Sequence, residues 1–186
     1  MGLRKILDRS DEALRKKCRP VTDFGERTAA LMDDLRETVV AANGAGLAAP
    51  QIGTLRRAAV IFNGEEIVEL INPEIIRRAE EEDTDIEGCL SCPDERAFIA
   101  RPKTVCVRAQ NRHGESFELE LEDFAARAAC HELDHLDGVL FTDHADIVYT
   151  EEEFEELMRE WAEEDEEDER LELEGKKRKK GGKKSR

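Results

Sequence analysis

The segment His131–His135, with the sequence HELDH, restricts the fold of this chain more than any other feature. Two histidines four residues apart lie on one face of a helix, about one turn apart, so both imidazoles can bind a single metal ion. Glu132 lies beside that face, where its carboxylate can take a proton from metal-bound water. The segment predicts a helix that carries part of a hydrolytic metal site, but it does not tell which bond is cut.

Length and composition predict a single domain in the cytoplasm. The 186 residues suffice for one full hydrophobic core and are too few for two ordinary domains. We find no apolar run long enough to span a membrane and no signal peptide, so we expect no membrane association. The five cysteines form an odd set, which argues against a disulfide framework and leaves at least one thiol as a candidate metal ligand.

Charge is unevenly distributed, and this divides the chain. Residues 1–150 carry 30 acidic and 19 basic side chains, residues 151–174 add 15 acidic ones, and residues 175–186 hold eight basic side chains. We expect a catalytic domain over residues 1–162 and a charged tail without a stable fold over residues 163–186. The net charge of −16 argues against nucleic-acid binding by the domain. For the basic end, a solvated tail is favoured over contact with ribosomal RNA phosphates.

Hydrophobic periodicity predicts three helices and a series of short strands. The helices are an N-terminal one over Phe24–Ala42, the histidine-bearing one over Asp123–Asp137, and a C-terminal one from about Glu151. The strand signals are the segments RRAAVIFN, IVELINPEII, RAFIARP, KTVCVRAQ and SFELELE. Because the strands come in hairpin-like series with few helices between them, the class is α+β rather than alternating βαβ.

Three interpretations of the histidine pair compete. A metzincin protease needs a third histidine three residues after the glycine of HELDHLDG, and Phe141 occupies that position. A structural zinc site would join Cys89 and Cys92 to the two histidines, but 38 residues separate Cys92 from the first of them, and Glu132 would have no role. A catalytic site with Cys89 as the third ligand and an open position for water does use Glu132, and we favour it.

Three motifs in order resemble those of the peptide deformylase family: GAGLAAPQ over residues 44–51, EGCLS over residues 87–91, and HELDH over residues 131–135. The resemblance extends over residues 3–148, and the ordered set is far more specific than any single motif. Members of this family remove the formyl group from the initiator methionine of nascent bacterial proteins. The resemblance implies an α+β domain in which antiparallel sheets surround a central HExxH helix.

The resemblance also implies the catalytic roles. The metal ligands would be Cys89, His131 and His135. Glu132 would act as general base and then as general acid, and the side chain of Gln51 and the backbone N–H of Leu90 would hold the formyl oxygen. The implied cofactor is one divalent metal, Fe²⁺ first, with Ni²⁺, Co²⁺ or Zn²⁺ able to replace it. Glu87 would be a buried carboxylate with Arg101 as its partner.

The substrate implied by the resemblance is an N-formyl-methionyl nascent peptide. The residues that would bind it are Gly44, Ala45, Gly46, Gly88, Phe124 and Ala128. Of these, Gly46 would lie beside the peptide backbone, and Phe124 and Ala128 would line the methionine pocket with Arg127 at its rim. We expect a monomer.

Three positions depart from the commonest family pattern: Ala45 replaces Val or Ile, Cys92 replaces Ile or Val, and Cys130 replaces Gln. None of them removes a ligand, the base or an oxyanion donor, so they bear on affinity and side-chain preference. Two alternatives stay open: another metal amidase with a different N-acyl substrate, and a non-catalytic, zinc-stabilised module that binds ribosomes. The presence of Glu132 and Gln51 disfavours the second, because a structural site needs neither.

Overall fold

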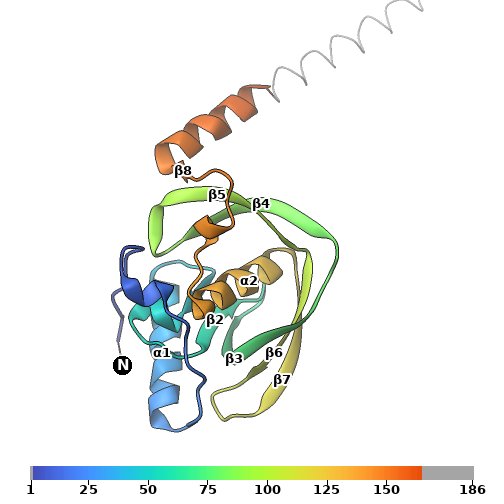
Figure 1. Cartoon of the computed structure of the whole chain (residues 1–186). Helices are drawn as coiled ribbons and strands as arrows, with labels where there is room; N and C mark the ends of the chain where they lie inside the picture. Colours follow the sequence, from blue (N-terminus) through green and yellow to red (C-terminus); the bar gives the residue numbers. More distant parts are fainter. Residues whose placement is uncertain (1, 165–186) are drawn as a thin grey trace, which may run out of the picture. The chain divides into compact units, whose positions relative to one another are not determined.

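The computed structural model describes residues 2–164, and the chain divides into two compact units, Met1–Val148 and Tyr149–Arg186 (Figure 1). The second unit contains the short strand β8 (Tyr149–Thr150) and a helix over residues 151–164, close to the predicted start at Glu151. Most of the predicted charged tail falls after residue 164 and lies outside the described residues. No helix within residues 2–164 is both long enough and apolar enough to cross a membrane.

A five-stranded sheet forms the main body of the first unit. Its strands, in spatial order, are β1 (Gly46–Ala48), β2 (Ala58–Phe62), β3 (Ile67–Arg78), β6 (Thr104–Gln110) and β7 (Ser116–Glu122). Every neighbouring pair is antiparallel. Strand β7 coincides with the predicted segment SFELELE, and its alternate apolar residues Phe117, Leu119 and Leu121 belong to one hydrophobic cluster. The predicted α+β class with antiparallel sheets is confirmed.

Strands β4 (Glu82–Cys89) and β5 (Cys92–Pro102) form a long antiparallel hairpin in a second sheet. The pairing runs from Glu82 opposite Pro102 to Cys89 opposite Cys92, so only two residues form the turn. Strand β4 is absent from the predicted strand segments. Its sequence, EDTDIEGC, is half acidic and therefore poor in β-propensity, and it becomes a strand by pairing with β5.

The two long helices of the first unit are α1 (Glu26–Ala41) and α2 (Asp123–Asp137). Short 3₁₀ helices complete it: η1 (Glu12–Arg15), η2 (Ala49–Ile52) and η3 (Phe141–Asp143). Helix α1 lies within the predicted range 24–42 and buries Met32, Leu35 and Val39 against β1 and β2. It ends before Asn43, whose φ of 53° is a left-handed conformation that asparagine tolerates.

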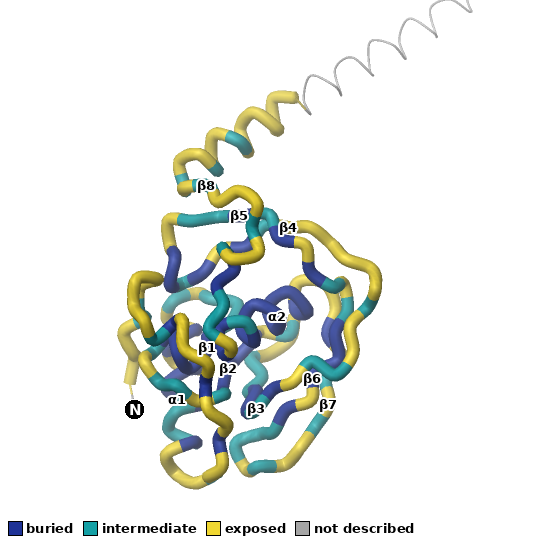
Figure 2. The backbone as a smooth tube through the Cα atoms, in the orientation of Figure 1, coloured by how far each residue is buried: buried dark blue, intermediate teal, exposed yellow. Residues whose placement is uncertain are grey.

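Helix α2 has eleven of its 15 residues buried, and most of it is dark blue in Figure 2. It contacts β1, β2, β6 and β7 of the large sheet and also β5 of the hairpin. Small side chains make this close approach feasible, because residues 125–130 read AARAAC and Ala126 and Ala129 are fully buried. The helix ends at Gly138, whose φ of 79° favours glycine and whose N–H caps the last turn. The histidine-bearing segment therefore lies in the interior.

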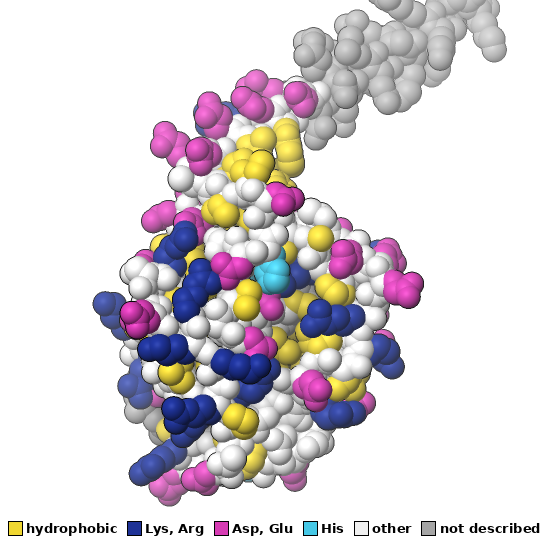
Figure 3. Space-filling model, in the orientation of Figure 1, with side chains coloured by type: hydrophobic (Ala, Val, Ile, Leu, Met, Phe, Trp, Pro, Cys, Tyr) yellow, Lys and Arg dark blue, Asp and Glu magenta, His cyan; other side chains and the backbone are white. Residues whose placement is uncertain are grey.

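The two units differ in how charged side chains are distributed over their surfaces. On the face seen in Figure 3, basic and acidic side chains are interspersed over the first unit. The helix of the second unit shows mainly acidic side chains, in line with the sequence EEEFEELMREWAEE over residues 151–164.

Candidate active site

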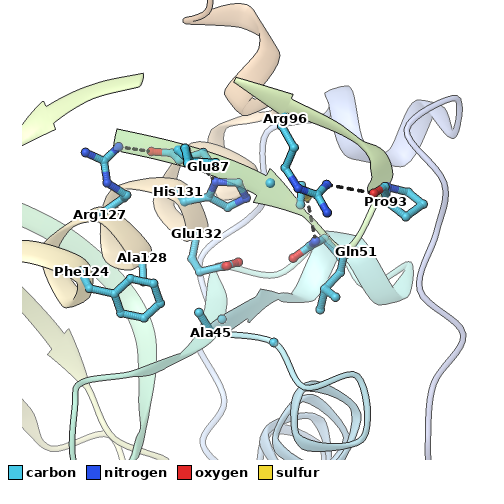
Figure 4. A pocket seen from close by; sticks show the side chains of 16 residues that line it. Ala45, Gln51, Glu87, Pro93, Arg96, Phe124, Arg127, Ala128, His131 and Glu132 are labelled. Carbon is cyan, nitrogen blue, oxygen red and sulfur yellow. Dashed lines mark hydrogen bonds and ion pairs between the residues drawn. The ribbon is translucent and has the colours of Figure 1, made fainter. Parts of the chain in front are cut away.

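A cavity of about 410 Å³ is bounded by the segment after α1, the turn between β4 and β5, and helix α2 (Figure 4). Residues of all three motifs line it, namely Gly44, Ala45, Gly46, Gln51, Gly88, Cys89, Leu90, His131 and Glu132, and so do Phe124 and Ala128. His135 is 1% exposed and lies behind this wall, in contact with Cys89. The fold thus brings together every residue that the sequence analysis assigned to the site.

Cys89, His131 and His135 form a buried group whose candidate ligand atoms all lie within 4.8 Å of one another. Cys89 is the last residue of β4, and the two histidines are one turn apart on α2. The Cys89 Sγ atom is 3.2 Å from His135 Nε2, and the two imidazole rings meet edge to face with their centroids 4.9 Å apart. One thiol and two imidazoles at this spacing match the donors that hold a transition metal or zinc in an open site.

Glu87 orients the first histidine. Its Oε2 atom lies 2.9 Å from Nδ1 of His131, which leaves Nε2 of that ring for the cavity side. The guanidinium of Arg101 donates to both Glu87 oxygens at 2.8 and 3.1 Å, and Arg127 donates to Oε1 at 3.1 Å. Burial raises the pKa of Glu87, but His131 and Arg101 outweigh it and hold that pKa at about 2. Glu87 is therefore a fixed carboxylate.

The two histidines differ in their electrostatic environment. Burial lowers the pKa of His131, but the hydrogen bond to Glu87 and the negative charges of Glu132 and Glu87 together outweigh burial, so the pKa lies above its usual value. Burial, helped by the nearby His131, holds the pKa of His135 well below its usual value. His135 is therefore a neutral ring at pH 7, as a metal ligand must be.

The three donors fit a divalent cation. The Cys92 thiol and burial raise the pKa of Cys89 well above its usual value, and a cation bound beside the sulfur would favour the thiolate. The carboxylate–histidine pair formed by Glu87 and His131 is the arrangement that fixes the tautomer of a metal-ligating histidine. Cys92 is not part of the ligand group found within residues 2–164, which favours an open site over the closed Cys₂His₂ alternative.

Glu132 extends from α2 into the middle of the cavity (Figure 4). It is 4% exposed, and its Oε2 atom is buried with no hydrogen-bond partner among the described residues. Burial raises the pKa of Glu132 to about 7, with the nearby His131 acting in the opposite direction. A carboxyl with a pKa near the working pH can both accept and return a proton.

Gly46 is required by the position of Glu132. A Cβ atom at residue 46 would lie 2.5 Å from Oε1 and 2.8 Å from Cγ of Glu132, well inside van der Waals contact. Strand β1 is held in place by pairing with β2, where Gly46 lies opposite Ile61. The glutamate side chain, rather than the backbone, would have to move if residue 46 gained a side chain.

We expect Gly46→Ala to lower kcat/KM by about 10²-fold, because a displacement of roughly 1 Å in a catalytic group costs that much. The measurement is steady-state kinetics of the metal-loaded variant. A double-mutant cycle with Glu132→Ala supplies the control, since the truncated side chain no longer meets the new methyl group. If Gly46→Ala costs as much in the Glu132→Ala background as alone, the alanine acts through something other than Glu132.

Gln51 faces Glu132 from the opposite wall of the cavity (Figure 4). It is 1% exposed, and its Oε1 atom accepts a 2.8 Å hydrogen bond from the backbone N–H of Ala48. This bond fixes the amide so that Nε2 is the donor end, 3.5 Å from Cys89 Sγ and 3.2 Å from Ser91 Oγ. Leu90 lines the same part of the cavity. Gln51 therefore presents an N–H group beside the candidate metal ligands.

Phe124 and Ala128 lie one turn apart on α2 and line one end of the cavity (Figure 4). Phe124 is 58% exposed as a residue, so it forms an open wall. Arg127, which was expected at the rim of this pocket, does line the cavity, but its guanidinium is turned toward the β4–β5 hairpin. Arg127 is 7% exposed and donates to Glu87 and to the backbone carbonyls of Ile99 and Asp83.

The sequence analysis missed this link because the long Arg127 side chain reaches from α2 to the β4–β5 hairpin, and β4 was not expected as a strand. It also missed Ile86 and Arg96, which line the cavity from β4 and β5. Ile86 precedes the EGCLS motif and carries no chemical signal of its own. An arginine five residues after that motif could have been considered, since a cationic side chain beside a cleft can donate hydrogen bonds to a bound molecule.

Comparisons with known proteins show the family to which this chain is similar. The family model "Polypeptide deformylase" matches residues 3–150. A peptide deformylase from Caldicellulosiruptor bescii is 51% identical over 155 residues, which cover 83% of this chain and 93% of the relative. The crystal structure of peptide deformylase from Thermotoga maritima matches with a TM-score of 0.77 and 41% identity, and covers 79% of this chain and 100% of its own.

A third similar structure is described as the Met-Ala-Ser-bound class I type b peptide deformylase from Acinetobacter baumannii. It is 29% identical, has a TM-score of 0.74, and covers 77% of this chain and 99% of its own. The similarity therefore spans nearly the whole of each of these relatives, rather than a shared fragment.

An α+β fold with a buried cysteine–histidine group beside a carboxylate defines the class as a metal-dependent hydrolase. Within that class, the chain belongs to the polypeptide deformylase family, which confirms the resemblance found in the sequence. It is an enzyme that removes the N-formyl group from the initiator methionine of nascent polypeptides and releases formate.

Proposed function

We propose that deformylation takes place in the cavity at α2, with Cys89, His131 and His135 as the ligands of one divalent metal. The observation that carries this proposal is the convergence of three donor atoms, a buried carboxyl and a fixed side-chain amide on one cavity. A divalent metal bound to these donors would supply Lewis acidity, which favours deprotonation of water and polarises a carbonyl.

In this proposal Glu132 moves the proton. Its carboxylate takes a proton from the attacking water and delivers it to the methionine nitrogen, which leaves as an amine. The pKa of about 7 supports both steps, because the group is not strongly biased toward either protonation state at neutral pH. The surrounding apolar and buried groups keep that carboxyl away from bulk water.

The developing negative charge on the formyl oxygen would be stabilised by Gln51 Nε2 and by the backbone N–H of Leu90. Support comes from the hydrogen bond between Gln51 Oε1 and the backbone N–H of Ala48, which holds the amide in one orientation before substrate binds. A preorganised donor of this kind is worth about 2.7–4 kcal/mol of transition-state stabilisation. Gly46 gives the room in which Glu132 packs, and Gly44, Ala45 and Gly88 complete the wall along the peptide.

We further propose that the methionine side chain enters the end of the cavity lined by Phe124 and Ala128. The relative from Acinetobacter baumannii, whose structure contains bound Met-Ala-Ser, supports a methionine-led peptide as the ligand. Ala45 is smaller than the Val or Ile expected there and leaves more space at the opposite wall. The side chain of the second peptide residue would therefore meet a wider cleft.

The remaining proposals concern the ion, the fold and the cellular setting. We propose Fe²⁺ as the native ion, with Ni²⁺, Co²⁺ or Zn²⁺ able to replace it, as the resemblance to the family implies; the thiolate and two imidazole donors suit each of these ions. Helix α2 would be the central HExxH helix of the fold, an assignment supported by its burial and by its contacts with strands of both sheets. We propose a cytoplasmic monomer. Ribosome contact through residues 176–186 is a proposal that lies outside the described residues.

The test is formate release from a formyl-Met tripeptide by protein loaded anaerobically with Fe²⁺. We expect formate from this peptide and no acetate from the matched acetyl-Met tripeptide, since a tight site admits a carbonyl that carries only hydrogen. Metal content is measured on the same samples. Metal-loaded protein that releases acetate as readily as formate would identify a broader N-acyl amidase, and loaded protein that releases neither would contradict the site assignment.

A further inference from the structure

Cys89 has a second cysteine directly opposite it across the β4–β5 hairpin. The register pairs Cys89 with Cys92, and the two residues between them, Leu90 and Ser91, form the turn. Both cysteines are free thiols and belong to the same buried cluster, with exposed fractions of 8% and 2%. The proposed mechanism uses Cys89 as a ligand and gives Cys92 no task.

The register places this pair within reach of a disulfide bond. Directly opposite residues of an antiparallel ladder have Cα atoms about 4.5 or about 5.5 Å apart, depending on whether the pair is hydrogen-bonded. Both values lie within the range of roughly 4.4–6.8 Å that disulfides span. Closing the bond therefore needs rotation of two short side chains and no large movement of the strands.

Only one cysteine of the pair faces the cavity. Cys89 lines the cavity, whereas Cys92 is not on its wall. The other three cysteines lie elsewhere: Cys18 packs with Ala48 and Leu136, Cys130 belongs to the cluster under the large sheet, and Cys106 is on β6. A small oxidant that enters the cavity thus meets Cys89 first, with Cys92 as the adjacent thiol.

We propose that Cys92 is a resolving thiol that captures oxidised Cys89 as a reversible disulfide. The Cys89 thiolate attacks a hydroperoxide oxygen, the O–O bond breaks, an alcohol or water leaves, and Cys89 becomes a sulfenic acid. The Cys92 sulfur then attacks the sulfenic sulfur, the S–O bond breaks and water leaves. In total the two thiols lose two electrons and two protons, and the hydroperoxide is reduced to an alcohol and water.

The disulfide would control metal binding, a consequence that rests on the proposed role of Cys89 as ligand. A sulfur in a disulfide is no longer a thiolate and is a poor ligand, so the metal would be released from the two remaining histidines. Exchange with a dithiol would restore both thiols, with the reductant oxidised to its own disulfide. Without Cys92, further oxidation of Cys89 to the sulfinic or sulfonic acid would be irreversible.

The experiment compares full-length wild type with Cys92→Ser and Cys92→Val, all loaded with Zn²⁺ so that the ion itself is not oxidised. Two variants are used because Cys92 is buried, and valine preserves the apolar packing if serine does not. Each protein is treated with hydrogen peroxide, and released Zn²⁺ is measured with a chromogenic chelator. Tryptic peptide 79–96 contains Cys89 and Cys92 and no other cysteine, so its mass reports the pair directly.

For wild type we expect this peptide to lose the mass of two hydrogens, Zn²⁺ to be released in proportion, and both changes to reverse with dithiothreitol. In the variants we expect a gain of oxygen on Cys89 that dithiothreitol does not reverse. A gain of oxygen in wild type, with no loss of hydrogen, would overturn the proposal. A disulfide that leaves Zn²⁺ bound would instead contradict Cys89 as a ligand, so the two proposals fail separately.

Discussion

The variant Glu132→Gln is expected to lose about 10²–10⁴-fold in kcat/KM for a formyl-Met peptide while binding metal as wild type does. General acid–base catalysis by a positioned side chain contributes an acceleration of this size. Glutamine keeps the shape of the side chain but can neither accept nor return the proton. The measurements are steady-state formate release and metal content on the same preparation.

Two further readouts separate a lost base from a damaged fold. The buried Glu132 Oε2 atom has no partner among the described residues, so replacing the carboxyl by an amide of equal size breaks no hydrogen bond at that atom. We therefore expect the Tm of Glu132→Gln to equal or exceed that of wild type. A variant with a lower Tm, or with reduced metal content, would show that Glu132 supports the site rather than acting in the reaction.

The pH dependence of kcat/KM is a further test of Glu132 as the general base. Because the pKa of Glu132 is raised by burial to about 7, the fraction of carboxylate falls as the pH drops. A bound cation favours the charged form, so the acidic limb of the wild-type kcat/KM profile should lie above pH 4.5 and at or below about 7. The residual activity of Glu132→Gln should lack this limb.

The sequence predicted those helices and strands whose own residues carry a hydrophobic pattern or an end signal. Strand β7 and helix α2 were predicted to the residue, because apolar residues alternate in the first and the glycine at 138 ends the second. Strand β4 was missed because its residues follow no hydrophobic alternation: four of its first six are polar or acidic and exposed, and its stability comes from pairing with β5. Long-range pairing of that kind leaves no local signal.

The candidate site also has residues that the sequence indicated and contacts that it did not. The spacing of HExxH singled out His131, His135 and Glu132, and the open-site interpretation with the family resemblance added Cys89; the structure brings these four side chains together. The contacts of Arg127 were not predictable, since nothing local indicates that a helix arginine reaches the carbonyl groups of Asp83 and Ile99. The proximity of Cys92 to Cys89 could have been inferred only with the hairpin register, which depends on the unpredicted strand β4.

The second large effect is expected at Glu87, which holds three buried partners at once. Its carboxylate accepts hydrogen bonds from Arg101 and Arg127 and pairs with His131 Nδ1, and all four side chains are at most 10% exposed. Removal of one partner from a buried ionic network typically costs about 3–5 kcal/mol, because the remaining charges stay buried without compensation. We expect Glu87→Gln to lower the free energy of unfolding by that amount, measured by urea unfolding of metal-free protein at pH 7.

The same substitution should weaken metal binding by about 10–100-fold, since an outer partner of a ligating histidine is lost. The matched control is Glu120→Gln, which removes the carboxylate of an exposed ion pair, 3.1 Å from Arg77, and should change stability by less than about 1 kcal/mol. If both variants lose the same small amount, Glu87 is not the centre of the network.

The pH dependence of this difference tests its electrostatic origin. The pKa of Glu87 is lowered from 4.5 to about 2 in the folded chain, so its contribution to stability is fully present above pH 4.5. That contribution is lost as the pH falls from 4.5 toward 2, because the folded state then has to take up a proton that the unfolded state already carries. The gap between wild type and Glu87→Gln should therefore be largest near neutral pH and should narrow through this window. A gap that stays constant down to pH 2 would mean that the glutamine disturbs packing, rather than removing the charge that compensates Arg101 and Arg127.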